Sequence, residues 1–226
     1  VGNLAGTAIT TGQYNTLVGG LAGDAITTSS HNTAIGYNSQ SATTTGDRNI
    51  SVGSYSLDSN TTGERNVAMG WAAMDANTTG SYNTAIGYAA LDANTTASHN
   101  VAVGYQSLSA NTTGYQNTAI GYQSLQNQTT GYYNVAVGMD ALEDVTTGVR
   151  KTAGGTFSVR TITTVSDNTG LGYGVLADAT GTQNTGVGSE TLIGVTTGDN
   201  NAAIGYRAGR NLSSGGGNTF LGKEAG

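Results

Sequence analysis

The sequence predicts an all-β fold, a parallel β-solenoid of about 13–14 coils with roughly 17 residues in each coil. Two observations support this: an asparagine that recurs every seventeen residues, and a glycine four positions after it. The asparagines are Asn15, Asn32, Asn49, Asn66, Asn83, Asn100, Asn117, Asn134, Asn168, Asn184, Asn201 and Asn218. The glycines include Gly19, Gly36, Gly53, Gly70, Gly87, Gly104, Gly121, Gly138, Gly155, Gly172, Gly188, Gly205 and Gly222. A strict period of this length is typical of stacked units that each contact only their neighbours.

The repeat extends over residues 1–226, which we expect to form a single solenoid domain. Lys151 replaces one marker asparagine and opens an irregular coil at 151–167, in which Val159 replaces the usual leucine. A one-residue deletion lies between residues 168 and 184. The chain begins in the middle of a repeat, which we interpret as part of a longer protein.

Each coil is expected to contain two short extended segments and two turns. Thr84–Ile86 is followed by Gly87, and Thr95–Thr96 by Ala97, so β-branched residues come in brief runs that small residues interrupt. A helix would have to carry paired threonines and glycines in every coil, at a cost in propensity.

Two apolar columns are expected to form a thin core, because equivalent residues of a solenoid lie above one another. The first contains Val18, Ile35, Val52, Met69, Ile86, Val103, Ile120, Val137, Leu171, Val187, Ile204 and Leu221. The second contains Leu57, Met74, Leu91, Leu108, Leu125, Leu142, Leu176 and Leu192. Burial of about two large apolar residues per coil contributes too little free energy to offset the conformational entropy lost when seventeen residues are ordered. We therefore expect an alanine column (Ala68, Ala85, Ala102, Ala119, Ala136) to be a flat seam that a homotrimer buries.

The recurring asparagine is interpreted as an internal ladder that pins the turn, as side-chain amides do in stacked parallel strands. This structural assignment, preferred to ligand binding, covers Asn32, Asn49, Asn66, Asn83, Asn100, Asn117 and Asn134. The glycine that follows meets either a positive φ or the close approach of another backbone, and that backbone could belong to another chain.

Composition excludes several classes of function. The chain has no cysteine, 10% charged residues, a net charge of −6 and eight scattered lysines and arginines, which argues against a nucleic-acid surface. Its apolar runs are far shorter than the roughly 20 residues of a membrane span, so we expect no membrane insertion. We find no serine–histidine–carboxylate constellation and no phosphate-binding loop, and predict neither enzymatic activity nor a cofactor.

Two aromatic sets are candidates for contact with a ligand. The first follows the glycine and is expected to pack between coils or across a trimer seam rather than to stack on sugars. It comprises Tyr37, Trp71, Tyr88, Tyr105, Tyr122, Tyr173 and Tyr206. The second lies in the variable turn and contains Tyr14; its other members, Tyr82, Tyr115, Tyr132 and Tyr133, are the candidate glycan contacts.

Asp58, Asp75 and Asp92 share one phase on consecutive coils, with Asp24 in the same phase. We expect solvent to screen these carboxylates, with a bridging calcium ion as the less favoured alternative. No metal site is predicted elsewhere, since His31 and His99 lie four coils apart.

Paired threonines give an alternative function, because regular threonine arrays on flat solenoids resemble the ice-binding face of antifreeze proteins. The candidate residues are Thr62, Thr79, Thr96, Thr113 and Thr130. Their neighbours two residues earlier are asparagines in some coils and Ile9, Ile26 or Val145 in others, which breaks the second column that such a plane needs. Four Asn-Thr-Thr triplets, at Asn60, Asn77, Asn94 and Asn111, also match a glycosylation acceptor.

The runs Asn83 to Gly87 and Asn100 to Gly104 resemble the head repeats of trimeric autotransporter adhesins. The full unit, such as Asn117 to Tyr133, is similar to repeats that precede the chaperone domain of phage-type tail fibres. This resemblance covers essentially the whole chain and implies a left-handed β-roll assembled as a homotrimer.

From these observations we expect the shaft or head of an extracellular fibre, either a phage-type tail fibre of the virion or an adhesin of the bacterial cell surface. Its partners would be further copies of itself and a cell-surface glycan or receptor, bound by shallow multivalent contacts. The alternatives are an ice-binding solenoid and a self-assembling filament whose exposed ends stack end to end.

Overall fold

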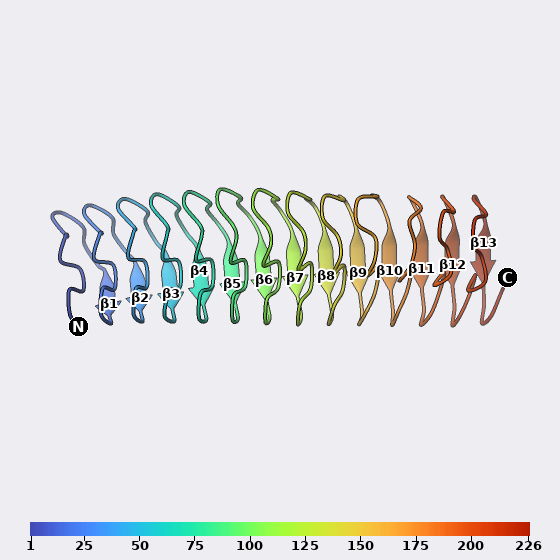
Figure 1. The fold of residues 1–226 in the computed structure, drawn as a ribbon, viewed down its shortest axis with the longest axis horizontal. Helices are drawn as coiled ribbons and strands as arrows, with labels where there is room; N and C mark the ends of the chain where they lie inside the picture. Colours follow the sequence, from blue (N-terminus) through green and yellow to red (C-terminus); the bar gives the residue numbers. More distant parts are fainter. The chain divides into compact units, whose positions relative to one another are not determined.

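A computed structural model describes residues 1–226 and confirms the all-β parallel solenoid. Each strand has three residues, and successive strands are one coil apart in sequence (Figure 1). The strands are β1 (Thr16–Val18), β2 (Thr33–Ile35), β3 (Ile50–Val52), β4 (Val67–Met69), β5 (Thr84–Ile86), β6 (Val101–Val103), β7 (Thr118–Ile120), β8 (Val135–Val137), β9 (Thr152–Gly154), β10 (Thr169–Leu171), β11 (Thr185–Val187), β12 (Ala202–Ile204) and β13 (Thr219–Leu221).

The chain divides into two compact units, Val1–Gln116 with β1–β6 and Asn117–Gly226 with β7–β13. Within each unit, every strand pairs in parallel with the next strand along the chain, and equivalent residues lie opposite each other. The irregular coil stays in this register, since β9 pairs with both β8 and β10. The one-residue deletion is also absorbed outside the strands, because Thr169 still pairs with Thr185.

The expectation of two strands per coil is wrong, because each coil has one. The second candidate segment forms a bend, in which the N–H groups of Thr78 and Thr79 both bond to the carbonyl of Thr95, at 2.8 and 3.2 Å. In a parallel ladder the bonds are evenly spaced along the strand and each carbonyl serves one donor. Two successive donors on one carbonyl therefore bend the chain here.

The leucine column is fully buried, as predicted, but the isoleucine and valine column is not part of the core. In β5, the middle residue Ala85 is buried while Ile86 is 38% exposed. Alternate residues of a strand point to opposite faces, so the alanine faces inward and its neighbours face outward. The alanine column is therefore not an outer seam.

From β2 to β12 the middle strand position holds a small residue, because neighbouring side chains fill the narrow interior of the coil. Leu17 in β1 and Phe220 in β13 fit only beside glycines such as Gly23 and Gly209. In β10 and β11 the middle residue is Gly170 and Gly186, where an added Cβ would lie 2.6 Å from Val159 and 2.5 Å from Val175. Side-chain volume, rather than hydrophobicity, therefore decides which residue of the strand faces the core.

The marker asparagines from Asn32 to Asn201 are buried and bond along the stack through both ends of the amide. The side-chain oxygen of Asn83 accepts the backbone N–H of Asn100 at 2.9 Å, and its amide nitrogen donates to the carbonyl of Ala97 at 2.9 Å. Both bonds tie the asparagine to the backbone stacked on it, 17 and 14 residues further along the chain. The same pair of bonds recurs at Asn49 and at Asn134.

A second asparagine ladder lies inside the bend. The amide of Asn77 donates to Asn60 at 2.9 Å, that of Asn94 to Asn77 at 2.7 Å, and that of Asn111 to Asn94 at 3.2 Å. All four side chains are completely buried. These asparagines, which match a glycosylation acceptor in sequence, are therefore enclosed in the folded chain.

The recurring glycine has both features that were predicted as alternatives, a positive φ and the close approach of another backbone. At Gly87 the backbone has φ +137°, and an added Cβ would lie 2.3 Å from the carbonyl oxygen of Gly104. The approaching backbone is the next coil of the same chain. This corner therefore holds the coils together and leaves no room for another chain.

Replacing one ladder asparagine should destabilise the stack. Asn83→Ala removes the buried acceptor of the Asn100 N–H and one donor to Ala97, so we expect unfolding to become easier by roughly 2–4 kcal/mol. Asn127→Ala, at an exposed position, should change stability by about 0.5 kcal/mol or less. Urea and thermal unfolding compare the two variants, and equal stabilities would contradict the role assigned to the ladder.

Candidate functional site

The outward residues of the strands form an apolar surface. In Val1–Gln116, Val18, Ile35, Met69 and Ile86 are between 38% and 41% exposed. In Asn117–Gly226, the equivalent residues Ile120, Val137, Leu171, Ile204 and Leu221 are also exposed. We call these residues, with their aromatic neighbours below, the outer strand face. Each unit thus presents a column of large apolar side chains to solvent.

The aromatic column begins two residues after this apolar column and stacks from coil to coil. Tyr88 lies 4.9 Å from Trp71 and 5.1 Å from Tyr105 between ring centroids, with interplanar angles of 13° and 10°. Tyr55 lies one residue later in its coil than the other aromatic residues, and it makes edge contacts with both Trp71 and Tyr37. Both faces of the Tyr88 ring are therefore covered, so a sugar can meet its edge but cannot stack on its face.

Among the predicted glycan contacts, Tyr82 is enclosed in the same way. The Arg65 guanidinium lies 5.1 Å over its ring and donates to its hydroxyl, and the His99 ring is stacked on it at 5.1 Å. Tyr115 is 40% exposed. In the second unit, Tyr132 and Tyr133 contact each other edge-on at 5.2 Å. The structure thus offers aromatic edges and hydroxyls on these turns, and it does not gather the four tyrosines into one pocket.

The threonine column is exposed and regular. Thr62, Thr79, Thr96 and Thr113 are exposed on successive coils, and Thr130 is exposed in the second unit. The neighbouring threonine of each pair is half-buried and donates its hydroxyl to the next coil, as Thr78 does to the carbonyl of Thr95 at 2.9 Å. The residues two positions earlier face the core, so they cannot supply a second outward column.

The aspartate column is stacked without forming a metal site. Burial, with the neighbouring Asp58 and Asp92, raises the pKa of Asp75 to about 6, and burial raises the pKa of Asp92. No three His, Cys, Asp or Glu side chains lie close enough together to hold a metal ion. The arrangement therefore gives no support to the calcium alternative for Asp58, Asp75 and Asp92.

Lys151 is a buried base within the asparagine ladder. Its side chain is completely buried, its backbone N–H bonds to Asn134 at 2.9 Å, and its ammonium group is 3.5 Å from the carbonyl of Ile162. Burial lowers the pKa of this amine from 10.5 to about 7. A lysine offers no acceptor to the next marker, Asn168, so the ladder is interrupted here.

The arginines of the second unit are paired with carboxylates on adjacent coils. Arg150 binds Asp167 through two bonds of 2.6 and 2.9 Å, and Arg160 lies 2.7 Å from Glu143. These bonds raise the pKa of each arginine and lower the pKa of Asp167. The arginines here are thus used to connect coils.

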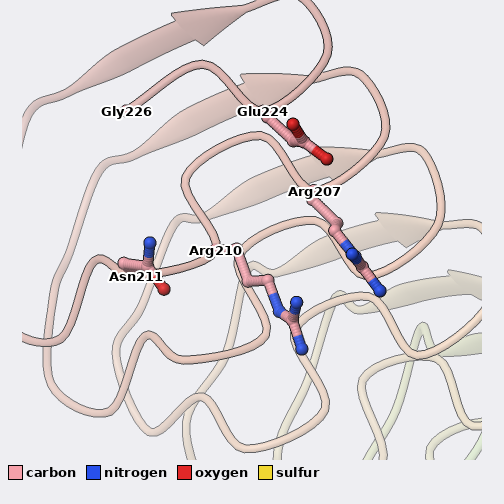
Figure 2. A pocket seen from close by; sticks show the side chains of 5 residues that line it. All are labelled: Arg207, Arg210, Asn211, Glu224 and Gly226. Carbon is pink, nitrogen blue, oxygen red and sulfur yellow. The ribbon is translucent and has the colours of Figure 1, made fainter.

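A small hollow of about 250 Å³ lies near the last coil, and Figure 2 shows the five residues that line it. Arg207 and Arg210 both face Glu190, at 2.8 and 3.6 Å, and Glu224 lines the same hollow. An anion would meet two carboxylates there, so we assign it no ligand.

One further column was missed by the sequence analysis, which treated the basic residues as scattered. The residue directly before each marker has a positive φ. In the first unit these residues are all exposed: Tyr14, His31, Arg48, Arg65, Tyr82, His99 and Gln116. Their spacing of seventeen is visible in the sequence and could have identified the column. Its outward direction required the coil geometry.

The structure has no helix long and apolar enough to cross a membrane. Comparisons with protein-family models, with curated proteins and with solved structures find no match.

The buried amine predicts a dependence of stability on pH. Between pH 7 and 10.5 the unfolded chain binds a proton at Lys151 more readily than the folded chain, so stability should rise with pH across this window, by about 1.4 kcal/mol for each unit of pKa difference. Lys151→Asn should restore the ladder, raise stability at pH 7 and flatten this rise. Lys223→Asn, at the exposed second lysine, is the matched control. Thermal unfolding between pH 7 and 9.5 tests this, and a flat wild-type profile would contradict it.

Proposed function

We propose that this solenoid is a structural segment of an extracellular fibre, such as a phage-type tail fibre or a bacterial surface adhesin. In this proposal three chains assemble around the outer strand face, and the turns make shallow, repeated contacts with cell-surface glycans. Avidity over identical faces replaces a deep pocket. The similarity of the repeats to those of trimeric fibres supports the number of chains and a left-handed coil.

The exposed outer strand face is the observation that carries the proposal. In the first unit it includes Val18, Ile35, Ile50, Met69, Ile86, Tyr37, Trp71, Tyr88 and Tyr105, each between 38% and 49% exposed. At roughly 150–200 Å² for each fully exposed large side chain, these nine residues present on the order of 700 Å². A standard interface takes about 800 Å² from each partner. One unit therefore exposes nearly enough surface for a stable interface.

A second copy of the chain fits this face because both surfaces repeat with the same spacing. Coils pair at about 4.8 Å, so side chains of one copy can fall between those of another over several coils. The strand positions themselves are uncharged, which avoids burial of unpaired charge. The interface thus uses the isoleucine and valine column instead of the alanine column that the sequence suggested.

Disruption of this face should separate the chains. Ile35→Lys with Ile86→Lys places two charges on the outer strand face, while Thr45→Lys with Thr96→Lys places the same charges on the exposed threonine column of the same coils. By light scattering, the wild type and the threonine variant should have a mass near three times 22.7 kDa, and the isoleucine variant a mass near 22.7 kDa.

A monomeric wild type would contradict the trimer. The exposed threonine column would then favour the ice-binding alternative, which a measurement of thermal hysteresis tests directly. A very large and heterogeneous mass would instead favour the self-assembling filament.

A further inference from the structure

The column before the marker asparagines gathers the arginines and histidines of the first unit in one exposed line. Val1–Gln116 contains two arginines, two histidines and no lysine, and all four residues lie in this column. Over six consecutive coils it contains Tyr14, His31, Arg48, Arg65, Tyr82 and His99, which we call the cationic ridge. All six side chains are exposed.

The backbone gives no reason for this choice of residues. The six positions have φ between +56° and +64°, the left-handed region that glycine, asparagine and aspartate occupy most readily. A bulky residue such as Tyr82 or Arg65 costs about 1 kcal/mol there relative to glycine. Other bulky residues, such as the buried Leu91, adopt the same conformation because they pack in the core, whereas the exposed ridge side chains have no such role.

The ridge is ordered by contacts between successive coils. Arg65 lies 5.1 Å over the Tyr82 ring, which is stacked on His99 at an angle of 5°, and Tyr14 lies 5.0 Å from His31. Side chains that are already held in place lose little conformational entropy when a ligand binds. The ridge is thus a preformed linear surface.

The two arginines of the ridge are both exposed and differ in their partners. Arg48 makes no ion pair, and the nearby Asp47 accepts the N–H of Ser30 at 2.7 Å. Arg65 lies 3.6 Å from Glu64, with both side chains more than 40% exposed, and it also donates to the Tyr82 hydroxyl of the next coil. By contrast, Arg150, at the equivalent position of the second unit, is held by two bonds to Asp167. Arg48 is thus left without an ion pair, and Arg65 keeps an exposed guanidinium whose pair with Glu64 is weak because solvent screens it.

We propose that the cationic ridge binds a linear acidic polysaccharide, with the Arg48 and Arg65 guanidinium groups on its carboxylate or sulfate groups. Arginine matches such groups with paired donors, and the line of side chains follows a chain-like ligand. The exposed Glu64 carboxylate can accept bonds from sugar hydroxyls, which the phosphate backbone of DNA lacks. DNA carries one charge per about 1.7 Å, whereas the ridge offers at most one per coil of about 4.8 Å.

This inference rests on the proposed function and names its ligand class, so the test separates the two. Binding of polygalacturonate, dextran sulfate, neutral dextran and single-stranded oligothymidylate is measured by calorimetry on the full chain. We expect binding to one or both acidic polysaccharides, weakening with added salt, and no binding to neutral dextran. The carboxylated and sulfated probes distinguish the two anionic groups.

The variant Arg48→Gln with Arg65→Gln should bind the acidic polysaccharide at least tenfold more weakly. Arg150→Gln with Arg160→Gln removes the same charge from paired positions and should stay within twofold of the wild type. Arg48→Lys with Arg65→Lys keeps the charge without the paired donors, so it should bind with intermediate affinity and guards against a variant that fails to fold.

Wild-type binding by the Arg48 and Arg65 variant, or no binding of either acidic polysaccharide by the wild type, would overturn the inference. Tighter binding of oligothymidylate would overturn the ligand class. Light scattering on the same samples measures assembly independently. Polysaccharide binding by the ridge can therefore be refuted while the trimer is supported, or the reverse.

Discussion

The buried side-chain amide of the marker asparagine is the interaction on which the solenoid depends. Each coil has only three strand residues, and its remaining backbone bonds to the next coil come from irregular turns, as from the N–H of Leu91 to Ser107 and of Thr95 to Thr112. The amide of a buried side chain adds two bonds to the backbone stacked on it, both 2.9 Å long at Asn83. Since an unpaired buried amide is costly, the ladder fixes the register as well as stabilising it.

The close stacking leaves little space inside the coil, so many large side chains lie on its outer surface. The glycine corner brings successive backbones so close that a Cβ at Gly87 would lie 2.3 Å from the next carbonyl. Inside, alanine, leucine and asparagine fill the space; outside, isoleucine, valine and tyrosine stand on the strand and its corner. The exposed apolar columns thus follow from the same constraint that makes the coil stable, and assembly is the simplest way to cover them.

The period in the sequence was sufficient to predict parallel stacking, the leucine core and the internal position of the asparagines. It could not decide which face of the strand is buried, because runs such as Val-Ala-Val are apolar at every position. Only the narrow interior selects alanine. The position of the aromatic column in the repeat was predictable. That both faces of the Tyr88 ring are covered was not, because the covering rings belong to adjacent coils. The cationic ridge was missed because basic residues were counted along the chain instead of by phase.

Hydrogen exchange at the backbone N–H groups of the marker asparagines tests the account most directly. Each of these groups is bonded to a side-chain oxygen, so ordinary strand pairing would not protect it. We predict that the N–H groups of Asn49, Asn66, Asn83 and Asn100 exchange as slowly as those inside the strands of the same unit. Exchange at the rate of exposed turn residues would contradict the claim that the amide ladder holds the coils together.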